Sequence, residues 1–254
     1  MRHTRAILAL AAALGAPVAA AACLGGTDNG CVAAVPIHNY ALGDATADTV
    51  TSQTCRHLYQ FTVDSQTNVR FNVTSPGLRT YLQLFDQRGA IVMNSALTRS
   101  PDTATSVRLM LGSGNYLLAV IPANLGQRGT FSLASVTDTA AVSGCERVWV
   151  TPGITTSQTI TAADCGLGPS GSSYPTHAYV LVLLQSQTVT VTETSASFPP
   201  ELQLAGQGNT DIATPDTTGT TASLAAIAQA QGAYTLWVGS SVAGKTGRYT
   251  LQIR

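Results

Sequence analysis

The stretch that decides the fold runs from Tyr59 to Ser75 and reads YQFTVDSQTNVRFNVTS. Its apolar residues fall on every second position on both sides of a Ser-Gln-Thr turn. They are Tyr59, Phe61 and Val63 before the turn and Val69, Phe71 and Val73 after it. Because successive side chains of a β-strand point to opposite faces of the sheet, this period of two predicts two strands, each with one buried face.

The same arrangement returns about 120 residues later, where Leu181 to Ser195 reads LVLLQSQTVTVTETS. Further matches keep their order along the chain, and their offset drifts only from 120 to 118 residues. They pair Tyr81–Leu84 with Glu201–Leu204, Gly114–Tyr116 with Gly232–Tyr234, and Gly129–Leu133 with Gly247–Leu251. This internal repeat predicts two domains, at residues 31–138 and 145–254, joined by a linker at 139–144.

Each repeat holds seven or eight short alternating stretches, separated by Gly or Ser turns. That pattern predicts an all-β chain made of two tandem antiparallel β-sandwich domains. Leu224–Gln231 has a brief helical pattern, but it aligns with the alternating stretch Val107–Leu111 of the first repeat. We therefore expect a strand there as well.

The composition excludes several classes of protein. The chain has 13 basic and 13 acidic residues, and only 10% of its 254 residues are charged, against 44% that are apolar. Soluble domains usually carry roughly 25% charged residues. Such sparse and balanced charge excludes a disordered charged tail, and it provides neither a basic surface for nucleic acid nor a polybasic membrane patch.

Residues 1–22 have the pattern of a signal peptide. Arg2 and Arg5 form a basic start, Ala6–Ala22 form an apolar stretch of small residues, and Ala20–Ala22 suit a signal peptidase. The apolar stretch is too short to predict a membrane span. We therefore expect the chain to be exported.

Four cysteines form two local pairs in the exported part of the chain. They are Cys31 with Cys55 and Cys145 with Cys165, one pair near the start of each repeat. Exported proteins keep such pairs oxidised, so we expect two disulfides with this connectivity among the three that four cysteines allow. The alternative, a zinc site, needs ligands that lie closer in sequence and histidine partners.

The fifth cysteine, Cys23, directly follows the expected cleavage point. Ala21, Ala22 and Cys23 resemble the lipobox of bacterial lipoproteins, which implies that Cys23 carries lipid. Residues 23–30 then form a flexible tether, because the stretch after Cys23 is rich in Gly and small polar residues. The alternative is an ordinary secretory cut at the same bond, which would leave a free thiol on a periplasmic or extracellular protein.

The order of motifs in the first repeat resembles the bacterial pre-peptidase C-terminal domain. The motifs are Tyr59-x-Phe61-x-Val63, Tyr81–Gly89, Leu111–Val120 and Gly129–Leu133. The resemblance implies a jelly-roll-like β-sandwich and a noncatalytic accessory role in an exported protein. The second repeat departs from the pattern in its central strand, where Ala205-Gly206 stands in place of Phe85-Asp86.

The sequence carries no recognised catalytic motif, neither a nucleophile elbow, a zinc-protease helix, a phosphate-binding loop nor a dinucleotide fingerprint. We find no histidine position that the repeat keeps consistently among His38, His57 and His177, and we interpret His57 as a surface or packing residue. The carboxylates show no calcium-loop spacing, so we predict no metal and no cofactor, and the alternative is a metal site assembled from separated loops. They are Asp44, Asp48, Asp64, Asp86 and Asp102.

Aromatic residues outside the alternating core pattern are candidates for ligand binding. Trp237 lies between Leu236 and Val238, so alternation predicts that its side chain points outward. Trp149 and Tyr174 are further candidates, since exposed aromatic rings stack on sugars or partner proteins. The alternative is that these rings cover an outer sheet face or a contact between the two domains.

These features together predict a noncatalytic cell-envelope protein with an accessory, adhesion or scaffold role. Its expected partner is an envelope glycan or another surface protein, and lipid is its expected link to the membrane. A carbohydrate-binding module that uses exposed aromatics is the first alternative. An uncharacterised secreted enzyme is the second and less favoured alternative.

Overall fold

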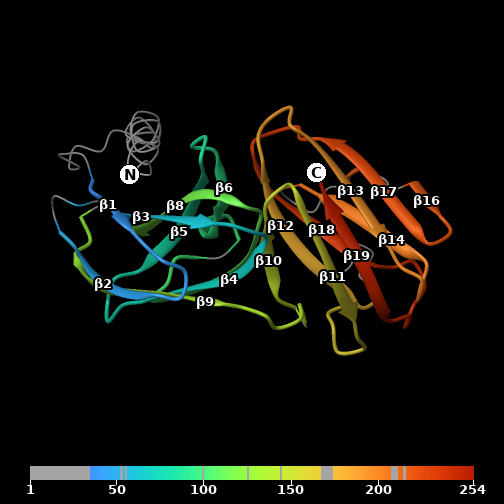
Figure 1. Ribbon diagram of the computed structural model, residues 1–254, viewed down its shortest axis with the longest axis horizontal. Coiled ribbons are helices and arrows are strands. Elements are labelled where there is room, and N and C mark those ends of the chain that lie inside the picture. The colour runs from blue at the N-terminus through green and yellow to red at the C-terminus, as the bar shows by residue number, and fades with distance from the viewer. Residues whose placement is uncertain are drawn as a thin grey trace, which may run out of the picture. The chain divides into compact units, whose positions relative to one another are not determined.

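The structure is a computed structural model, and Figure 1 shows its course along the chain. The residues that it describes are 35–51, 54, 56–98, 100–124, 126–143, 145–166, 174–206, 211–213 and 216–254. The expected signal peptide, the tether with Cys23, and the pair Cys31 and Cys55 lie outside them. Within these ranges, no helix has the length and apolarity needed to cross a membrane.

The described chain is built almost entirely from strands, which confirms the predicted all-β class. The first nine are β1 (Ile37–Asn39), β2 (Ala45–Val50), β3 (His57–Val63), β4 (Thr67–Thr74), β5 (Thr80–Asp86), β6 (Ile91–Asn94), β7 (Ala104–Leu111), β8 (Gly114–Pro122) and β9 (Gly129–Thr137). The short 3-10 helix η1 (Ser95–Leu97) follows β6.

The strands of the second repeat follow after residue 146. They are β10 (Arg147–Val150), β11 (Ile154–Ile160), β12 (Thr176–Leu183), β13 (Thr188–Thr194), β14 (Pro200–Ala205), β15 (Asp211–Ala213), β16 (Asp216–Thr218), β17 (Thr221–Ile227), β18 (Gly232–Ser240) and β19 (Gly247–Ile253). The first half of the stretch with a brief helical pattern, Leu224–Ile227, lies in strand β17, as its alignment with the first repeat predicts.

The chain forms two compact units. Unit 1 holds Met1–Asp64, Phe71–Ser106 and Ser113–Val136, and unit 2 holds Ser65–Arg70, Val107–Gly112 and Thr137–Arg254. The expected domain limits, 31–138 and 145–254, stay a prediction.

Unit 1 has a five-stranded sheet in the order β1-β3-β8-β5-β6, and strands β4, β9 and β2 are neighbours in its second sheet. The rings of Phe61 on β3 and Phe71 on β4 lie 5.5 Å apart across the two layers. The alternating residues of the first repeat are buried in this core, including Tyr59, Phe71 and Phe131 at 1% exposure or less.

Unit 2 has one sheet in the order β11-β19-β13-β17-β16 and a second in which β15, β14, β18, β12, β10 and β7 follow one another. Its core contains the inward residues of both layers, among them Tyr179, Leu236 and Tyr249. Val142, from the segment expected to be a linker, also belongs to this core and is 1% exposed.

Not every strand pair is antiparallel, which corrects the sequence-based prediction. Strand β1 pairs in parallel with β3, and β10 pairs in parallel with β12 and β7. The reason is the path of the chain, because β2 lies in the other sheet between β1 and β3, and β11 lies in the other sheet between β10 and β12. Such a crossover returns the chain to the first sheet in the same direction.

The two units repeat the same registers. His57 lies opposite Val120 and Tyr59 opposite Leu118, and His177 and Tyr179 lie opposite Val238 and Leu236 in the same way. The crossing strands match as well. His38 lies opposite Tyr59 as Val148 lies opposite Tyr179, and Asp48 lies opposite Phe131 as Gln158 lies opposite Tyr249.

The core of unit 2 contains a buried chain of polar side chains. The Nδ1 atom of His177 lies 2.7 Å from the Tyr249 hydroxyl, which lies 2.6 Å from the Tyr179 hydroxyl, and His177 Nε2 lies 3.3 Å from a carboxylate oxygen of Asp164. Glu193 is fully buried, and neither carboxyl oxygen has a well-formed hydrogen-bond partner among the described residues. Burial raises the pKa of Glu193 to about 9, against a smaller opposing effect of the backbone at Glu201 and Gly239.

We predict that replacing this buried acid makes unit 2 more stable in a pH-dependent way. Folded Glu193 keeps its proton up to about pH 9, whereas an unfolded glutamate loses it near pH 4.3. Stability of the wild type therefore falls between these values as the pH rises, by at most about 1.4 kcal/mol per pH unit. Glu193→Gln should raise the urea midpoint clearly at pH 8 and much less at pH 5. An equal change at both pH values would contradict a neutral buried carboxyl group.

Candidate metal centre

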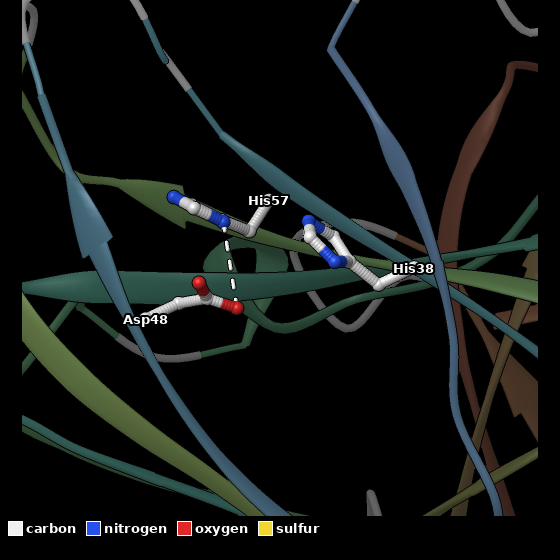
Figure 2. Close-up of side chains that lie close together, drawn as sticks. All are labelled: His38, Asp48 and His57. Carbon is white, nitrogen blue, oxygen red and sulfur yellow. Dashed lines mark ion pairs between the residues drawn. The ribbon is translucent and has the colours of Figure 1, made fainter.

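Three side chains of ligand type meet at one edge of unit 1. They are His38 from β1, Asp48 from β2 and His57 from β3, and their ligand atoms all lie within 4.8 Å of one another. Figure 2 shows the two imidazole rings and the carboxylate turned toward the same space. Strands β1 and β2 are the end strands of their respective sheets. The cluster therefore joins the two layers at the open edge of the sandwich.

Hydrogen bonding fixes the tautomer of His57. Its Nε2 atom lies 3.0 Å from the backbone carbonyl oxygen of Thr49. A carbonyl can only accept a hydrogen bond, so Nε2 carries the hydrogen and Nδ1 carries the lone pair of the neutral ring. Burial lowers the pKa of His57, with Asp48 and the Thr49 carbonyl acting against it.

The Nδ1 atom of His57 is buried and has no hydrogen-bond partner among the described residues. It faces the Oδ2 atom of Asp48 at 3.7 Å, and the His57 residue is 7% exposed. Two electron-pair donors thus face each other without a hydrogen between them. A buried polar atom left in this way costs about 1 to 3 kcal/mol. A cation placed between the two atoms would remove that cost.

Neighbouring side chains hold the ligands in place. The hydroxyl of Tyr59 donates a hydrogen bond of 2.6 Å to Asp48 Oδ2, and burial, followed by this hydrogen bond and the charge of Asp48, strongly raises the pKa of Tyr59. The ring centre of Tyr59 lies 5.6 Å from that of His38, and Phe131 meets His57 edge-on at 5.2 Å. Metal ligands in proteins are usually oriented by such outer hydrogen bonds.

Two imidazoles and one carboxylate define the class of metal. This donor set suits zinc and other first-row divalent ions, whereas calcium takes six to eight oxygen ligands. Three protein ligands leave a tetrahedral ion one position for water or for an atom of a partner.

The structure shows why the sequence search for metal ligands missed this cluster. That search compared carboxylates with the spacing of a local loop, and it considered Asp48 alongside Asp44, Asp64, Asp86 and Asp102. Only Asp48 among them belongs to the cluster. The statement that the repeat keeps no histidine position was wrong, because His57 and His177 occupy the same register. Their separation of 120 residues, equal to the repeat offset, was a signal in the sequence.

The proposed aromatic platform is not exposed. Trp237 on β18 is 8% exposed and Trp149 on β10 is 3% exposed, so the prediction of two solvent-facing rings was wrong. Alternation places Leu236 and Val238 in the core as expected. The opposite face is also covered here, since all eight residues of the neighbouring strand β12 are buried. Tyr174 is half-buried.

The cysteine predictions can be followed for one pair. A disulfide joins Cys145 to Cys165, whose Cα atoms lie 5.0 Å apart. Cys31 and Cys55 lie outside the described residues, as does Cys23. Their predicted disulfide and lipid attachment stay predictions.

Comparison with known proteins gives matches to solved structures alone. No protein-family model matches the sequence, and no curated protein matches it either. Among solved structures, the chain is similar to the pre-peptidase C-terminal domain of a Bacillus anthracis collagenase, at 16% identity and a TM-score of 0.36, over 41% of this chain and 99% of that one. It is also similar to the PBSX exported protein XepA, at 9% identity and a TM-score of 0.22, over 84% of this chain and 82% of that one.

A third similar structure is the tandem CBM22-1 and CBM22-2 domain of Paenibacillus barcinonensis Xyn10C. It shares 9% identity and a TM-score of 0.22, over 83% of this chain and 91% of that one. All three TM-scores are low, so the β-sandwich assignment rests on the strands of this chain itself. None of these comparisons indicates an enzyme family.

We predict that Trp237 behaves as a core residue. Trp237→Ala should lower the free energy of unfolding by about 3 to 5 kcal/mol, the usual cost of truncating a buried tryptophan. Val242→Ala is a matched control in the same unit, because Val242 is 42% exposed and surface changes usually stay within about 0.5 kcal/mol. Urea unfolding measures both. If both variants lost the same small amount of unfolding free energy, Trp237 would be a solvent-exposed residue after all.

Proposed function

We propose that the chain is a noncatalytic accessory protein of the cell envelope whose first β-sandwich unit binds one divalent transition-metal ion. His38, Asp48 and His57 are the ligands. The observation that carries this proposal is the buried lone pair of His57 Nδ1, which faces the Asp48 carboxylate at 3.7 Å without a hydrogen-bond partner among the described residues. Zinc is the favoured ion, because it takes nitrogen and carboxylate ligands in tetrahedral geometry.

The accessory role agrees with the filled cores of both units. Each inner face is occupied by the apolar side chains of its own strands. Export and attachment through Cys23 are supported by the sequence pattern of residues 1–23. Burial of Trp237 and Trp149 removes two of the three aromatic residues that favoured a carbohydrate-binding module, so a surface protein is the partner that we favour over an envelope glycan.

The metal site predicts stoichiometric zinc binding. Isothermal titration calorimetry of the untagged mature chain, after treatment with EDTA and dialysis, should give one zinc ion per chain. His57→Gln should abolish measurable binding, since it removes a ligand. Tyr59→Phe should weaken binding about 10- to 100-fold, because Asp48 loses the hydroxyl that orients it.

Asp44→Asn is the matched control for this titration. Asp44 directly precedes β2 and lies outside the three-residue cluster, so the variant should bind zinc like the wild type. Zinc binding by His57→Gln at wild-type affinity would refute the assigned ligands.

If the chain is attached to the envelope as proposed, Cys23 carries the lipid. Cells grown with a fatty-acid probe should label the wild-type protein, and Cys23→Ser should lose the label and enter the soluble fraction. Equal labelling of the two proteins, or equal release, would show that Cys23 does not anchor the chain.

A further inference from the structure

One of the three ligands, His38, lies on a strand that buries few of its own side chains. Strand β1 has only three residues, and it pairs with β3 alone at the end of its sheet. None of its residues is buried, and Ile37 is 37% exposed. Because apolar burial is the main source of docking energy, β1 gains little of it from its own side chains.

The chain directly after β1 is fixed independently of the cluster. Tyr40 is 8% exposed, and its hydroxyl donates a hydrogen bond to the Asp44 carbonyl and is hydrogen-bonded to the Ser135 hydroxyl. The backbone N–H of Tyr40 also donates to the Gln60 carbonyl at 2.9 Å. The chain is therefore anchored at Tyr40, and β1 is the part whose docking depends on His38.

Of the three equivalent positions in unit 2, only one holds a residue that can bind a metal ion, which is His177. The registers place Val148, Gln158 and His177 where unit 1 has His38, Asp48 and His57. Val148 is fully buried, and β10 lies between β12 and β7 instead of at the end of a sheet.

Two polar side chains at this position in unit 2 have hydrogen-bond partners within the protein. The Oε1 atom of Gln158 accepts a hydrogen bond from the Val142 N–H at 3.0 Å. His177 Nδ1 is paired with the hydroxyl of Tyr249, where unit 1 has Phe131 and no hydroxyl. Both units place a buried histidine nitrogen beside a carboxylate, His57 Nδ1 beside Asp48 and His177 Nε2 beside Asp164, but among the described residues unit 1 adds a second histidine, His38, to this pair.

We propose that the metal ion is a clip that fastens β1 to the open edge of unit 1, so that metal availability controls whether the N-terminal strand is docked. This inference rests on the proposed metal-binding function. An ion bound by His38, Asp48 and His57 links β1 to its neighbour β3 in the same sheet and to β2 in the other sheet. Release of the ion leaves β1 with its short parallel pairing, while unit 2 stays closed.

Hydrogen exchange of the full mature chain tests the clip. Amide exchange is followed by mass spectrometry with EDTA and with zinc at about 100 times its Kd. If β1 opens only after the ion leaves, zinc at this concentration should slow exchange of the β1 amides about 100-fold. Peptides from β12 and β18 should exchange at the same rate in both solutions, which also shows that unit 2 remains folded.

A variant that carries the residues of unit 2 is the sharpest control. His38→Val with Asp48→Gln should bind no zinc, and its β1 amides should exchange at one rate with or without the metal. Asp44→Asn should respond to zinc like the wild type. Tight zinc binding by the wild type with no change in β1 exchange would overturn the clip and leave the metal site in place. Absence of zinc binding in the calorimeter would overturn the site as well.

Discussion

The path of the chain between the two layers is the constraint on which the rest of unit 1 depends. Strands β1 and β3 are neighbours in one sheet, and β2, which lies between them in sequence, belongs to the other. This crossover makes the β1–β3 pair parallel, and it brings side chains from three successive strands to one edge. The ligands His38, Asp48 and His57 meet there because the backbone crosses there.

The two units show two solutions to the same structural problem. In both units the first strand pairs in parallel with the third. Unit 2 has buried Val148 and Gln158 where unit 1 has His38 and Asp48, and both units share the third position, which is His177 or His57. The difference lies in a few side chains on a common backbone, which is why the residues of unit 2 serve as a control for unit 1.

Much of the fold was predictable from the sequence because burial alternates with a period of two. The inward set of Tyr59, Phe61 and Val63 is buried as predicted, and the alignment of the repeats correctly placed strand β17. Alternation reports which face a side chain joins, but it does not report whether the other face is covered. Trp237 points away from the core of Leu236 and Val238 and is nevertheless buried.

The candidate site was not predictable from local spacing, since its ligands are separated by 10 and 9 residues along the chain and meet only through the crossover. The separation of His57 and His177 equals the repeat offset and so pointed to His57 as a residue of interest. The sequence pattern around His38 gave no comparable sign that it lies beside His57. Parallel pairing of β1 with β3 supplies that information, and it depends on the sheet to which β2 belongs.

Zinc K-edge X-ray absorption of the one-to-one zinc complex tests the metal site most directly. The account predicts a first shell of nitrogen and oxygen atoms at about 2.0 to 2.2 Å, with the outer-shell scattering of two imidazole rings. In His38→Ala, loaded with zinc to the same extent, the outer-shell scattering should correspond to one imidazole ring instead of two. A sulfur shell at about 2.3 Å, or a shell of oxygens without imidazole scattering, would contradict a site made of His38, Asp48 and His57.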